Sequence, residues 1–409
     1  MTAARGSDGL LSQAMEMAGD LVRWRREIHQ WPELGFEEVR TARLVVSSLR
    51  QMDRAGGKRG GWRIREGVGR TGVVADLGSA EPVVALRADM DALPIQETTA
   101  LPYASRRPGL MHACGHDAHV AILLGAARLL SGRRLPGAVR LLFQPSEEAA
   151  DSEGFSGAAR MIQDGAMEGV SAVFGLHVIT ELPTGTVGVR AGAVQAASDS
   201  LQLVVKGCGA HAAQPHRSRD PIYIASQLVS SLQSVVSRSV DPLAPAVVSL
   251  GTISGGTRAN IIPESVVMTG TIRTLDERTR EAVHSEIRQI APGIAAALGG
   301  SCEVGIGRGY PVTVNDGALT DLVRQVAEKM LGAGAVRDIE PSMGAEDFSL
   351  LAQQCRGCFF RLGVTPEGQE PTWGHSPTFE VDEAALPIGA ALLAGCALRY
   401  LTQATGAGD

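Results

Sequence analysis

The sequence predicts an α/β fold in which a mostly parallel sheet forms one domain and a smaller α+β domain is inserted into it. Its 409 residues exceed the roughly 250–300 residues that one hydrophobic core usually serves, so two domains are expected. Up to residue 192, continuous apolar strands alternate with helices, which is typical of a parallel sheet covered on both faces. From residue 193 the strands alternate polar and apolar residues, which indicates an antiparallel sheet. We therefore expect a discontinuous domain of residues 1–192 and 311–409, with residues 193–310 inserted.

The larger domain is expected to alternate helices with strands. Its predicted helices cover residues 15–30, 36–52, 119–130, 157–167 and 384–402. Its predicted strands cover residues 72–78, 83–91, 170–177 and 357–364, with a further strand that starts at 138 and runs into a proline-broken acidic turn ending at 148. Ionisable side chains gather just past the carboxyl ends of these strands: Asp89, Asp91, Glu147, Glu148 and His177. Because ligands bind at that edge of an open α/β sheet, we expect these side chains to converge on one crevice.

The inserted domain is expected to follow a β-α-β-β-α order. Strands are predicted over residues 198–207 and 246–256, and a strand leading into a helix over 266–291. The helix over 220–238 has Asp220 as its expected N-cap and Pro221 at its first position. The smaller domain should therefore pack its helices on an antiparallel sheet.

Composition excludes several classes of partner. The formal net charge is −6 and 20% of the residues are charged, which argues against the basic face that nucleic acid requires. No window approaches the roughly 18 apolar residues needed to span a bilayer, so no membrane is expected. The N-terminus lacks the pattern of a signal peptide, and the six cysteines have no framework spacing. These features predict a cytoplasmic protein with reduced thiols.

The stretch MHACGHDAHV, residues 111–120, concentrates side chains that bind metals. Thiolate and imidazole are preferred ligands of zinc and similar ions, and Cys114 and His116 are spaced so that both can reach one side of a turn. His112 and His119 stay open as further candidates, since spacing alone does not exclude them. The alternative is a histidine-rich loop that caps a helix, with Asp117 in the first turn.

The acidic turn QPSEE has two interpretations. Adjacent glutamates after a strand are often solvated turn residues. Here, however, neighbouring side chains diverge, so Glu147 and Glu148 can differ in role, one binding metal while the other accepts a proton from water. His177 in FGLH and His375 in GHSP are lone histidines, which are more often satisfied core or surface residues than ligands. Their value as ligand candidates depends on the other groups that lie near them.

Ten sequence blocks between about residues 23 and 400 resemble the M20D subgroup of the M20 metallopeptidases, in the same order. These blocks are RREIHQWPELGFEE, LRADMDALPIQE, MHACGHDAH, FQPSEE, FGLH, GAHAAQPHRSRDP, SGGTRANIIP, GTIRT, GAEDFS and GHSPTFEVDEAAL. The subgroup includes aminoacylases, hippurate hydrolases, auxin-conjugate amidohydrolases and N-acetyl-diaminopimelate deacetylases. Ten ordered blocks make the resemblance specific.

The resemblance implies an amidohydrolase with two divalent metal ions, whose larger domain is catalytic. The implied metal ligands are Cys114, His116, Glu148, His177 and His375. Glu147 matches the general base, and Asp91 matches the aspartate that orients a ligand. Many M20 enzymes carry histidine where this sequence has Asp89, and here the cysteine–histidine loop is expected to replace that ligand. Zinc is the first expectation for the metal, with manganese, cobalt or nickel as alternatives.

The resemblance also implies that the inserted domain is a lid that mediates a homodimer. His211 matches a histidine that crosses into the partner subunit's site and polarises the scissile carbonyl. Asn260 and Arg273 match residues that hold the substrate, and the planar guanidinium of arginine suits a free carboxylate. From the residues alone, Asn260 would be interpreted as a turn residue and Arg273 as a surface arginine at the end of a strand.

The expected function is hydrolysis of the amide bond in N-acyl amino acids or small peptide-like conjugates, releasing an amino acid and a carboxylic acid. A dipeptidase or carboxypeptidase of the same fold is the main alternative, and a non-catalytic ligand-binding relative is a further one. A cysteine hydrolase with Cys114 as nucleophile is also conceivable, but it does not explain why glutamates and histidines gather at the same edge. The CRGC sequence at 355–358 lacks a second pair of ligands and is expected to be structural.

Overall fold

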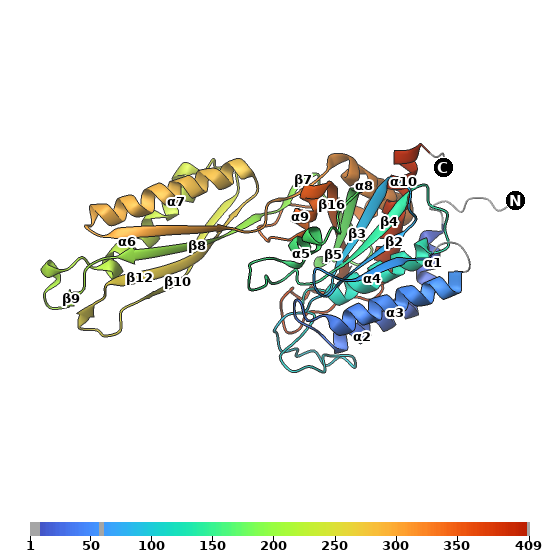
Figure 1. The fold of residues 1–409 in the computed structure, drawn as a ribbon, viewed down its shortest axis with the longest axis horizontal. Helices are drawn as coiled ribbons and strands as arrows, with labels where there is room; N and C mark the ends of the chain where they lie inside the picture. Colours follow the sequence, from blue (N-terminus) through green and yellow to red (C-terminus); the bar gives the residue numbers. More distant parts are fainter. Residues whose placement is uncertain (1–8, 57–60, 407–409) are drawn as a thin grey trace. The chain divides into compact units, whose positions relative to one another are not determined.

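The computed structural model describes residues 9–56 and 61–406. The chain divides into two compact units (Figure 1). The larger unit comprises Met1–Gly192, Val314–Glu340 and Leu350–Asp409, and the smaller unit comprises Ala193–Thr313 and Pro341–Ser349. The sequence analysis placed Pro341–Ser349 in the larger domain. The structure joins this segment to the smaller unit because the amide of Ser342 donates to the carbonyl of Val194, and the amide of Ala196 donates to that of Gly344.

The larger unit contains an eight-stranded sheet in the order β1-β2-β4-β3-β5-β16-β6-β15. Its strands are β1 (Arg63–Val68), β2 (Gly72–Leu77), β3 (Val83–Asp89), β4 (Ala138–Gln144), β5 (Val170–Pro183), β6 (Val187–Val189), β15 (Val336–Asp338) and β16 (Arg356–Thr365). The central strands β4, β3, β5 and β16 are parallel, whereas β2 and β6 run antiparallel to the strands that they join at the centre. The predicted mostly parallel sheet is therefore confirmed.

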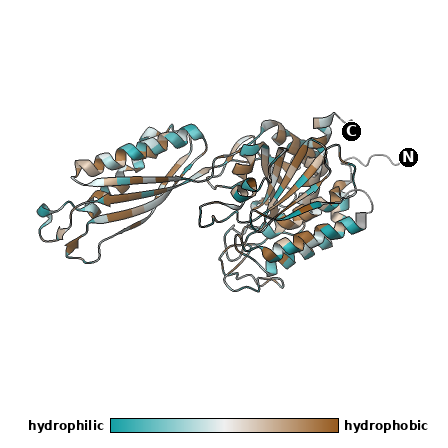
Figure 2. Cartoon of the chain, in the orientation of Figure 1, coloured by the Kyte–Doolittle hydropathy of each residue, from teal (hydrophilic) through white to brown (hydrophobic). Residues whose placement is uncertain are grey.

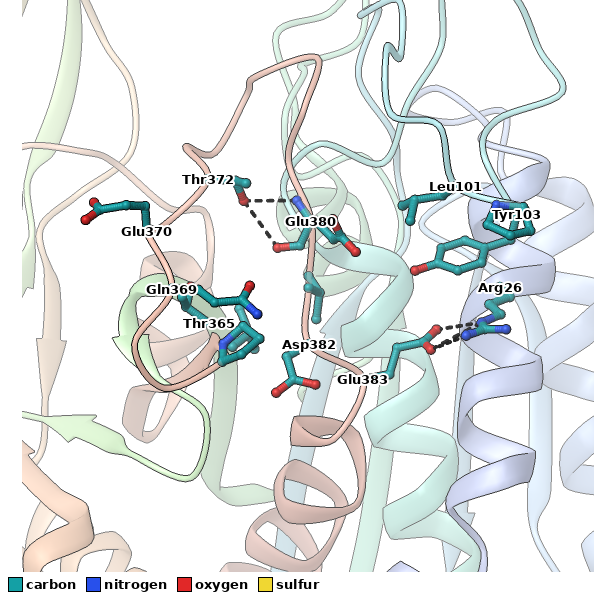
Figure 3. A pocket seen from close by; sticks show the side chains of 14 residues that line it. Arg26, Leu101, Tyr103, Thr365, Gln369, Glu370, Thr372, Glu380, Asp382 and Glu383 are labelled. Carbon is teal, nitrogen blue, oxygen red and sulfur yellow. Dashed lines mark hydrogen bonds and ion pairs between the residues drawn. The ribbon is translucent and has the colours of Figure 1, made fainter.

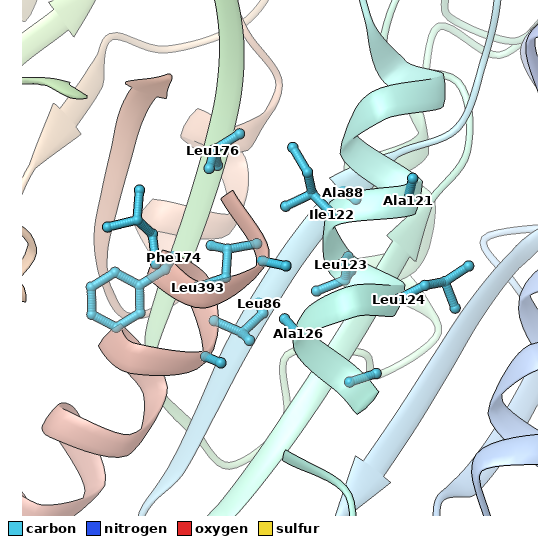
Figure 4. Close-up of a cluster of buried hydrophobic side chains, with 14 of the residues drawn as sticks. Leu86, Ala88, Ala121, Ile122, Leu123, Leu124, Ala126, Phe174, Leu176 and Leu393 are labelled. Carbon is cyan, nitrogen blue, oxygen red and sulfur yellow. The ribbon is translucent and has the colours of Figure 1, made fainter. Parts of the chain in front are cut away.

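Helices pack on and beside this sheet. They are α1 (Leu10–Glu16), α2 (Ala18–Gln30), α3 (Val39–Gly56), α4 (His116–Leu130), α5 (Gly157–Gln163), α8 (Gly317–Leu331) and α10 (Ala385–Thr405), and α9 (Phe348–Gln354) lies where the chain returns from the smaller unit. Helix α4 packs against α10, and both lie on the central strands (Figure 4). Leu86 of β3, Ile122 of α4 and Leu393 of α10 are almost completely buried there. This contact fixes α4, and therefore its first residue His116, relative to the sheet.

One helix among the described residues, α10, is long and apolar enough by length and composition to cross a membrane. The sequence analysis missed it when it found no window of this kind. In the structure 83% of that window is buried, and the helix forms the centre of the core. A helix that is hydrophobic on all sides is expected in such a position.

Several elements differ from the sequence-based expectation. The helix predicted over 15–30 is broken at Met17 into α1 and α2. The strand predicted to end at His177 continues to Pro183, so His177 lies inside β5 and not after it. Strands β1, β6 and β15 were not predicted, because β1 is mostly exposed and the other two have only three residues each.

The smaller unit contains an antiparallel sheet in the order β10-β12-β8-β13. Its strands are β8 (Ala197–Lys206), β10 (Ala246–Gly255), β12 (Ser265–Thr274) and β13 (Ser301–Arg308), and its helices are α6 (Pro221–Ser231) and α7 (Glu277–Ala297). Leu203, Met268 and Ile287 are fully buried between sheet and helices. Asp220 caps α6 as predicted, because its carboxylate accepts hydrogen bonds from the amides of Ile222 and Tyr223.

Two short strands extend the smaller unit, β9 (Ala210–His211) and β11 (Ile261–Ile262), and they pair with each other. The strands β7 (Gly192–Gln195) and β14 (Thr313–Asn315) lie where the chain passes between the units. The strands of the larger sheet are predominantly hydrophobic, whereas α3 and α7 carry hydrophilic residues among hydrophobic ones (Figure 2). This pattern is expected of a buried sheet covered by amphipathic helices.

Candidate metal centre

Three neighbouring strands bring the ionisable groups to one edge of the larger sheet. Asp89 is the last residue of β3, and Asp91 follows two residues later. The turn Pro145–Glu148 follows β4, which is the parallel neighbour of β3 on one side. On the other side lies β5, which contains His177. The carboxyl ends of β3 and β4 thus deliver acidic side chains to the same edge, as expected for a parallel sheet.

The loop before α4 depends on a glycine. Gly115 has φ +90°, in the left-handed region that favours glycine. A Cβ at this position would lie 2.3 Å from Cγ2 of Val178, so there is also no space for a side chain. The residue turns the chain sharply between Cys114 and His116, which is the first residue of α4. The two side chains can therefore face the same region from a loop and from a helix.

Asp91 orients two of the predicted ligands. Nδ1 of His116 lies 2.9 Å from the carbonyl oxygen of Asp91 and 3.2 Å from its Oδ1, so Nδ1 carries the proton that this ring donates. The amide of Glu148 donates to Oδ2 of Asp91 at 3.0 Å. Nε2 of His116 is left as the atom that faces the acidic groups. Fixing one ring nitrogen so that the other is available is how carboxylates orient metal-binding histidines.

His375 reaches the same place from the loop between β16 and α10. Its amide donates to the carbonyl of Ala113 at 2.8 Å, which ties this loop to the one before α4. Its φ of +60° is uncommon for a residue with a side chain, so the contact holds it in a strained conformation. Nε2 of His375 lies 3.1 Å from Oε1 of Glu148. The Glu148 carboxylate accordingly raises the pKa of His375.

The five predicted ligands and Glu147 form overlapping groups. Each group has its possible ligand atoms within 4.8 Å of one another. Three of these groups are Cys114–His116–His177, Cys114–Glu148–His375 and His116–Glu147–Glu148. Cys114 belongs to two of them, and its Sγ lies 3.4 Å from Nε2 of His177. The structure therefore gathers all six side chains, and Cys114 belongs to two sets of candidate ligands.

The donor set fits divalent cations. Nε2 of His116 is buried and has no hydrogen-bond partner in the described part of the chain. Although burial favours the neutral ring, the charge of Asp89 raises the pKa of His116 well above its usual value. The negative charge of Asp89, which favours a proton at this ring, also favours a metal cation beside it. One thiol, three imidazoles and one carboxylate match the ligands of zinc and related ions.

The two histidines that the sequence left open have different roles. Nδ1 of His119 lies 2.5 Å from Oδ1 of Asp89, and its Nε2 accepts a hydrogen bond from the amide of Val178 at 2.9 Å. Both of its nitrogens are thus used within the protein. His112 is 1% exposed and belongs to none of the metal-compatible groups found among the described residues. Burial lowers the pKa of His112 to about 4, so its ring is neutral.

A buried ionic cluster that the sequence analysis did not identify lies behind the histidine loop. Oδ2 of Asp117 accepts hydrogen bonds from Nε of Arg25 and Nδ1 of His29, both at 2.8 Å. Nε2 of His29 lies 3.3 Å from Oε1 of Glu97. Burial alone would raise the pKa of Asp117, but Arg25 and His29 lower it. The one available signal was the four-residue spacing of Arg25 and His29 on a helix.

The loop that presents His375 is braced on its other side. Thr372 exchanges hydrogen bonds with the backbone of Glu380, and Arg26 of α2 pairs with Glu383 at 2.6 Å (Figure 3). A pocket of about 490 Å³ lies between this loop and the segment around Tyr103 (Figure 3). None of the predicted site residues lines it. The bracing limits how far the loop can move His375.

The remaining predicted site residues lie in the smaller unit. His211 pairs with Ile261, and the carbonyl of Asn260 accepts the amide of Ala212 at 3.0 Å, so His211 and Asn260 are neighbours. Nδ1 of His211 accepts the amide of Ala213 at 3.1 Å, which leaves Nε2 as the donor.

Arg273 lies near the C-terminal end of β12, where it pairs with Ser198 of β8. Ser265, at the other end of β12, pairs with Lys206, close to the turn that leads to His211. The eight residue steps from Ser265 to Arg273 span roughly 26 Å in a strand. Within the smaller unit, the structure brings His211 and Asn260 together but keeps Arg273 apart from them.

Comparison with known proteins identifies the family. The model of peptidase family M20/M25/M40 matches residues 85–399. The chain belongs to this family. It is 43% identical over 370 residues to an N-acetyl-L-cysteine deacetylase of Bacillus subtilis, covering 90% of this chain and 84% of the relative. It is 39% identical over 398 residues to thermostable carboxypeptidase 1 of Saccharolobus solfataricus, covering 96% and 98% of the two chains.

The structural comparison agrees with the sequence comparison. The crystal structure of the YXEP protein of Bacillus subtilis, described as a dinuclear metal-binding peptidase of the M20 family, matches with a TM-score of 0.81 and 36% identity. The match covers 95% of this chain and 99% of that one. This M20 chain is therefore a metal-dependent hydrolase of amide or peptide bonds, which rules out the non-catalytic alternative.

The cysteine hydrolase alternative also fails on the chemistry of Cys114. Burial raises the pKa of its thiol to about 12, and burial lowers the pKa of His177 well below its usual value. An activated thiolate requires the opposite shifts, a lowered thiol pKa beside a protonated base. A nearby cation would instead supply the charge that stabilises the thiolate as a ligand.

Proposed function

We propose that this chain hydrolyses the amide bond of N-acyl amino acids with the help of two divalent metal ions. The observation that carries this proposal is the overlap of two candidate ligand groups, which share Cys114, beside the carboxylate of Glu147. Two sets of donors that have Cys114 in common would offer places for two cations. The deacetylase and carboxypeptidase relatives support a substrate whose amide bond lies next to an amino acid.

The proposed ligands are Cys114, His116 and His177 for one ion, and Cys114, Glu148 and His375 for the other. When bound, the ions would supply Lewis acidity and lower the pKa of the attacking water. Zinc is the proposed metal because thiolate and imidazole predominate among the donors. Manganese, cobalt and nickel are the alternatives. The six cysteines are all free, which supports a reducing, cytoplasmic location.

Glu147 is the proposed general base. It is 8% exposed and lies within the same group as His116 and Glu148. It would accept a proton from the attacking water and return it to the leaving amine, so that water is consumed and an acid and an amine are released. Asp91 keeps His116 and Glu148 in place through the hydrogen bonds described above.

The smaller unit is proposed to complete the site as a lid in a homodimer. Nε2 of His211 is available to donate a hydrogen bond to the substrate carbonyl. Asn260 would help to hold the substrate. Arg273 would bind the free carboxylate. Because roughly 26 Å of strand separates Arg273 from the turn leading to His211, one small substrate cannot contact both residues of the same copy. We therefore assign His211 and Asn260 to the partner copy's site.

The exposed surface of the smaller unit supports such a dimer. Ile222 and Tyr223 of α6 are 46% and 54% exposed, and Ile253 of the edge strand β10 is 57% exposed. An open edge strand beside exposed apolar side chains is a suitable surface for a second copy.

A substrate panel tests the proposed function. The purified protein, loaded with zinc, manganese, cobalt or nickel, is incubated with acetyl-, benzoyl-, long-acyl- and indolyl-amino acids and with dipeptides, and the free amino acid is measured. We expect release from at least one N-acyl amino acid, abolished by chelator and restored by metal. Turnover of dipeptides alone would replace the proposal with a peptidase activity.

Mixing two inactive variants tests the shared site. H211A and R273A are each expected to lower kcat/KM, H211A by about 10²–10³-fold because it removes a donor to the oxyanion. In a 1:1 mixture re-equilibrated into mixed dimers, one of the two sites would receive both residues intact. Activity should then rise well above that of either variant alone. Activity that stays at the level of the single variants would contradict the assignment to different copies.

A further inference from the structure

The turn that carries Glu147 and Glu148 has an unfavourable backbone conformation. Ser146, the residue just before them, has φ +41°, which residues with a side chain rarely adopt. It is fully buried, and its carbonyl oxygen accepts the amide of Gly157 at 2.9 Å. Such a conformation persists only when the surrounding structure fixes it. The groups that fix Ser146 therefore also determine the direction in which the two glutamates leave the turn.

One buried carboxylate holds the amide of Ser146 and joins this turn to two other segments of the chain. Glu38, just before α3, is 0% exposed, and its Oε1 accepts the amide of Ser146 at 2.8 Å. The same oxygen accepts the amide of Phe36 at 3.0 Å, and Phe36 is also left-handed, with φ +63°. Oε2 accepts the hydroxyl of Thr71. Glu38 thus connects three separate segments of the chain.

Close backbone packing leaves the turn no space to relax. A Cβ on Gly35 would lie 2.2 Å from Oγ of Ser146, and a Cβ on Gly72 would lie 2.9 Å from Cδ of Pro145. A Cβ on Gly157 would lie 1.6 Å from the carbonyl oxygen of Pro145. The turn is thus in contact with glycines of three different segments. A shift in the segments that Glu38 connects would be transmitted directly to Glu147 and Glu148.

We propose that Glu38 is a positioning residue for the active site, which sets the directions of Glu147 and Glu148 by holding the amide of Ser146. This inference rests on the proposed function, since it assumes that Glu147 acts as base and Glu148 as ligand. Glu38 itself contacts neither of them in the hydrogen bonds described. Its effect would nevertheless be large, because a misplacement of about 1 Å in a catalytic group can cost about 10²-fold in rate.

The requirement is for hydrogen-bond acceptors at Glu38 and not for its charge. Burial raises the pKa of Glu38 to about 7, so the neutral carboxyl group is accessible near neutral pH. Glutamine has the same shape and keeps one oxygen for the amides of Phe36 and Ser146. Its amide nitrogen can donate to the hydroxyl of Thr71, which then accepts. E38Q should therefore keep the positioning function of Glu38, whereas E38A should lose it.

The test compares E38A, E38Q and E38D with the wild type, all loaded with Co²⁺. Two readouts are used: kcat and KM on the best substrate of the panel, and Co²⁺ affinity from the visible and thiolate charge-transfer absorption. For E38A we expect kcat to fall about 10–100-fold with KM within about threefold, and Co²⁺ to bind at least about tenfold more weakly. E38Q should stay within about threefold of the wild type. E38D has a shorter side chain that withdraws from Ser146, so its kcat and Co²⁺ affinity should lie between those of E38A and E38Q. E38D provides the test if E38A does not fold.

E33A is the matched control. Glu33 is also buried before α3, and its carboxylate accepts the amides of Arg40 and Thr41 and the hydroxyl of Thr41, each at 2.9–3.0 Å. These contacts stabilise the start of α3 and do not involve the turn of Ser146. E33A should therefore lose stability, as E38A does, while keeping kcat and Co²⁺ affinity within about threefold of the wild type.

Two results would overturn the proposal. One is an E38A protein that keeps both kcat and Co²⁺ affinity, and the other is an E33A protein that loses as much of both as E38A does. If the wild type hydrolyses no substrate of the panel, the proposed function fails on its own. The Co²⁺ titration then decides the role of Glu38 separately, since it reports on the site of Glu148 without turnover.

Discussion

Replacing Glu147 with glutamine is expected to lower kcat by about 10³-fold, within the 10²–10⁴-fold that a general base contributes. The physical reason is that the amide cannot accept the proton of the attacking water, although it has the same size. About 10³-fold in rate corresponds to about 4 kcal/mol of activation free energy. The measurement is release of free amino acid by the metal-loaded protein under saturating substrate. KM should change little, because the residues that contact the substrate would be otherwise unchanged.

The neighbouring residue provides the control for this prediction. E148Q removes a proposed ligand, so it should lower metal affinity, whereas E147Q should bind the wild-type amount of metal. The two variants make the same chemical change at adjacent positions of the chain. An E147Q protein with full metal content and near wild-type kcat would contradict its role as base. Equal loss of metal in both variants would show that Glu147 is a ligand instead.

Replacing Cys114 with serine is expected to weaken binding of both metal ions and to abolish activity at ordinary metal concentrations. Cys114 belongs to both ligand groups, so the loss should exceed the roughly 10–100-fold that removing an orienting partner costs. Because the pKa of the thiol is about 12 without metal, binding at pH 7 must release its proton. The affinity of the wild type should therefore rise with pH. Calorimetric titration in buffers of different ionisation enthalpy measures both the affinity and the protons released.

Cys355 supplies the matched control for this variant. It is half-buried, and burial raises the pKa of its thiol to about 12 as well, but it belongs to none of the ligand groups found in the described part of the chain. C355S should therefore keep the wild-type affinity, activity and proton release. A C114S protein that binds two ions as tightly as the wild type would refute the shared-ligand arrangement.

Much of the site could be proposed from the sequence because its parts are short and chemically distinctive. Cys114 and His116 stand out by residue type, and Glu147 and Glu148 stand out by their position after an apolar strand. Asp220 and Pro221 likewise predicted the start of α6, since capping depends on neighbouring residues only. The mostly parallel sheet followed from the alternation of apolar strands and helices. All of these signals are local.

The roles of the open candidates could not be read from the sequence. His119 and His112 lie in the same stretch as Cys114. In the structure, however, both ring nitrogens of His119 form hydrogen bonds, one with Asp89 and one with the amide of Val178. The end of β5 was misplaced for a similar reason: the strand continues past His177 because it pairs with β16, which is far away in the chain. Partners that are distant in sequence leave no local pattern.

The sequence by itself pointed to the side chains that we propose as metal ligands, to where most helices and strands lie, and to an inserted antiparallel domain. Only the tertiary structure decided that Cys114 belongs to two ligand groups, that Asp91 directs His116 and Glu148, and that Glu38 holds the turn before them. Residue type and periodicity record the chemistry and burial of each position. Distances and hydrogen bonds between segments arise only when folding brings these segments together. They therefore cannot be predicted from any short stretch of the sequence.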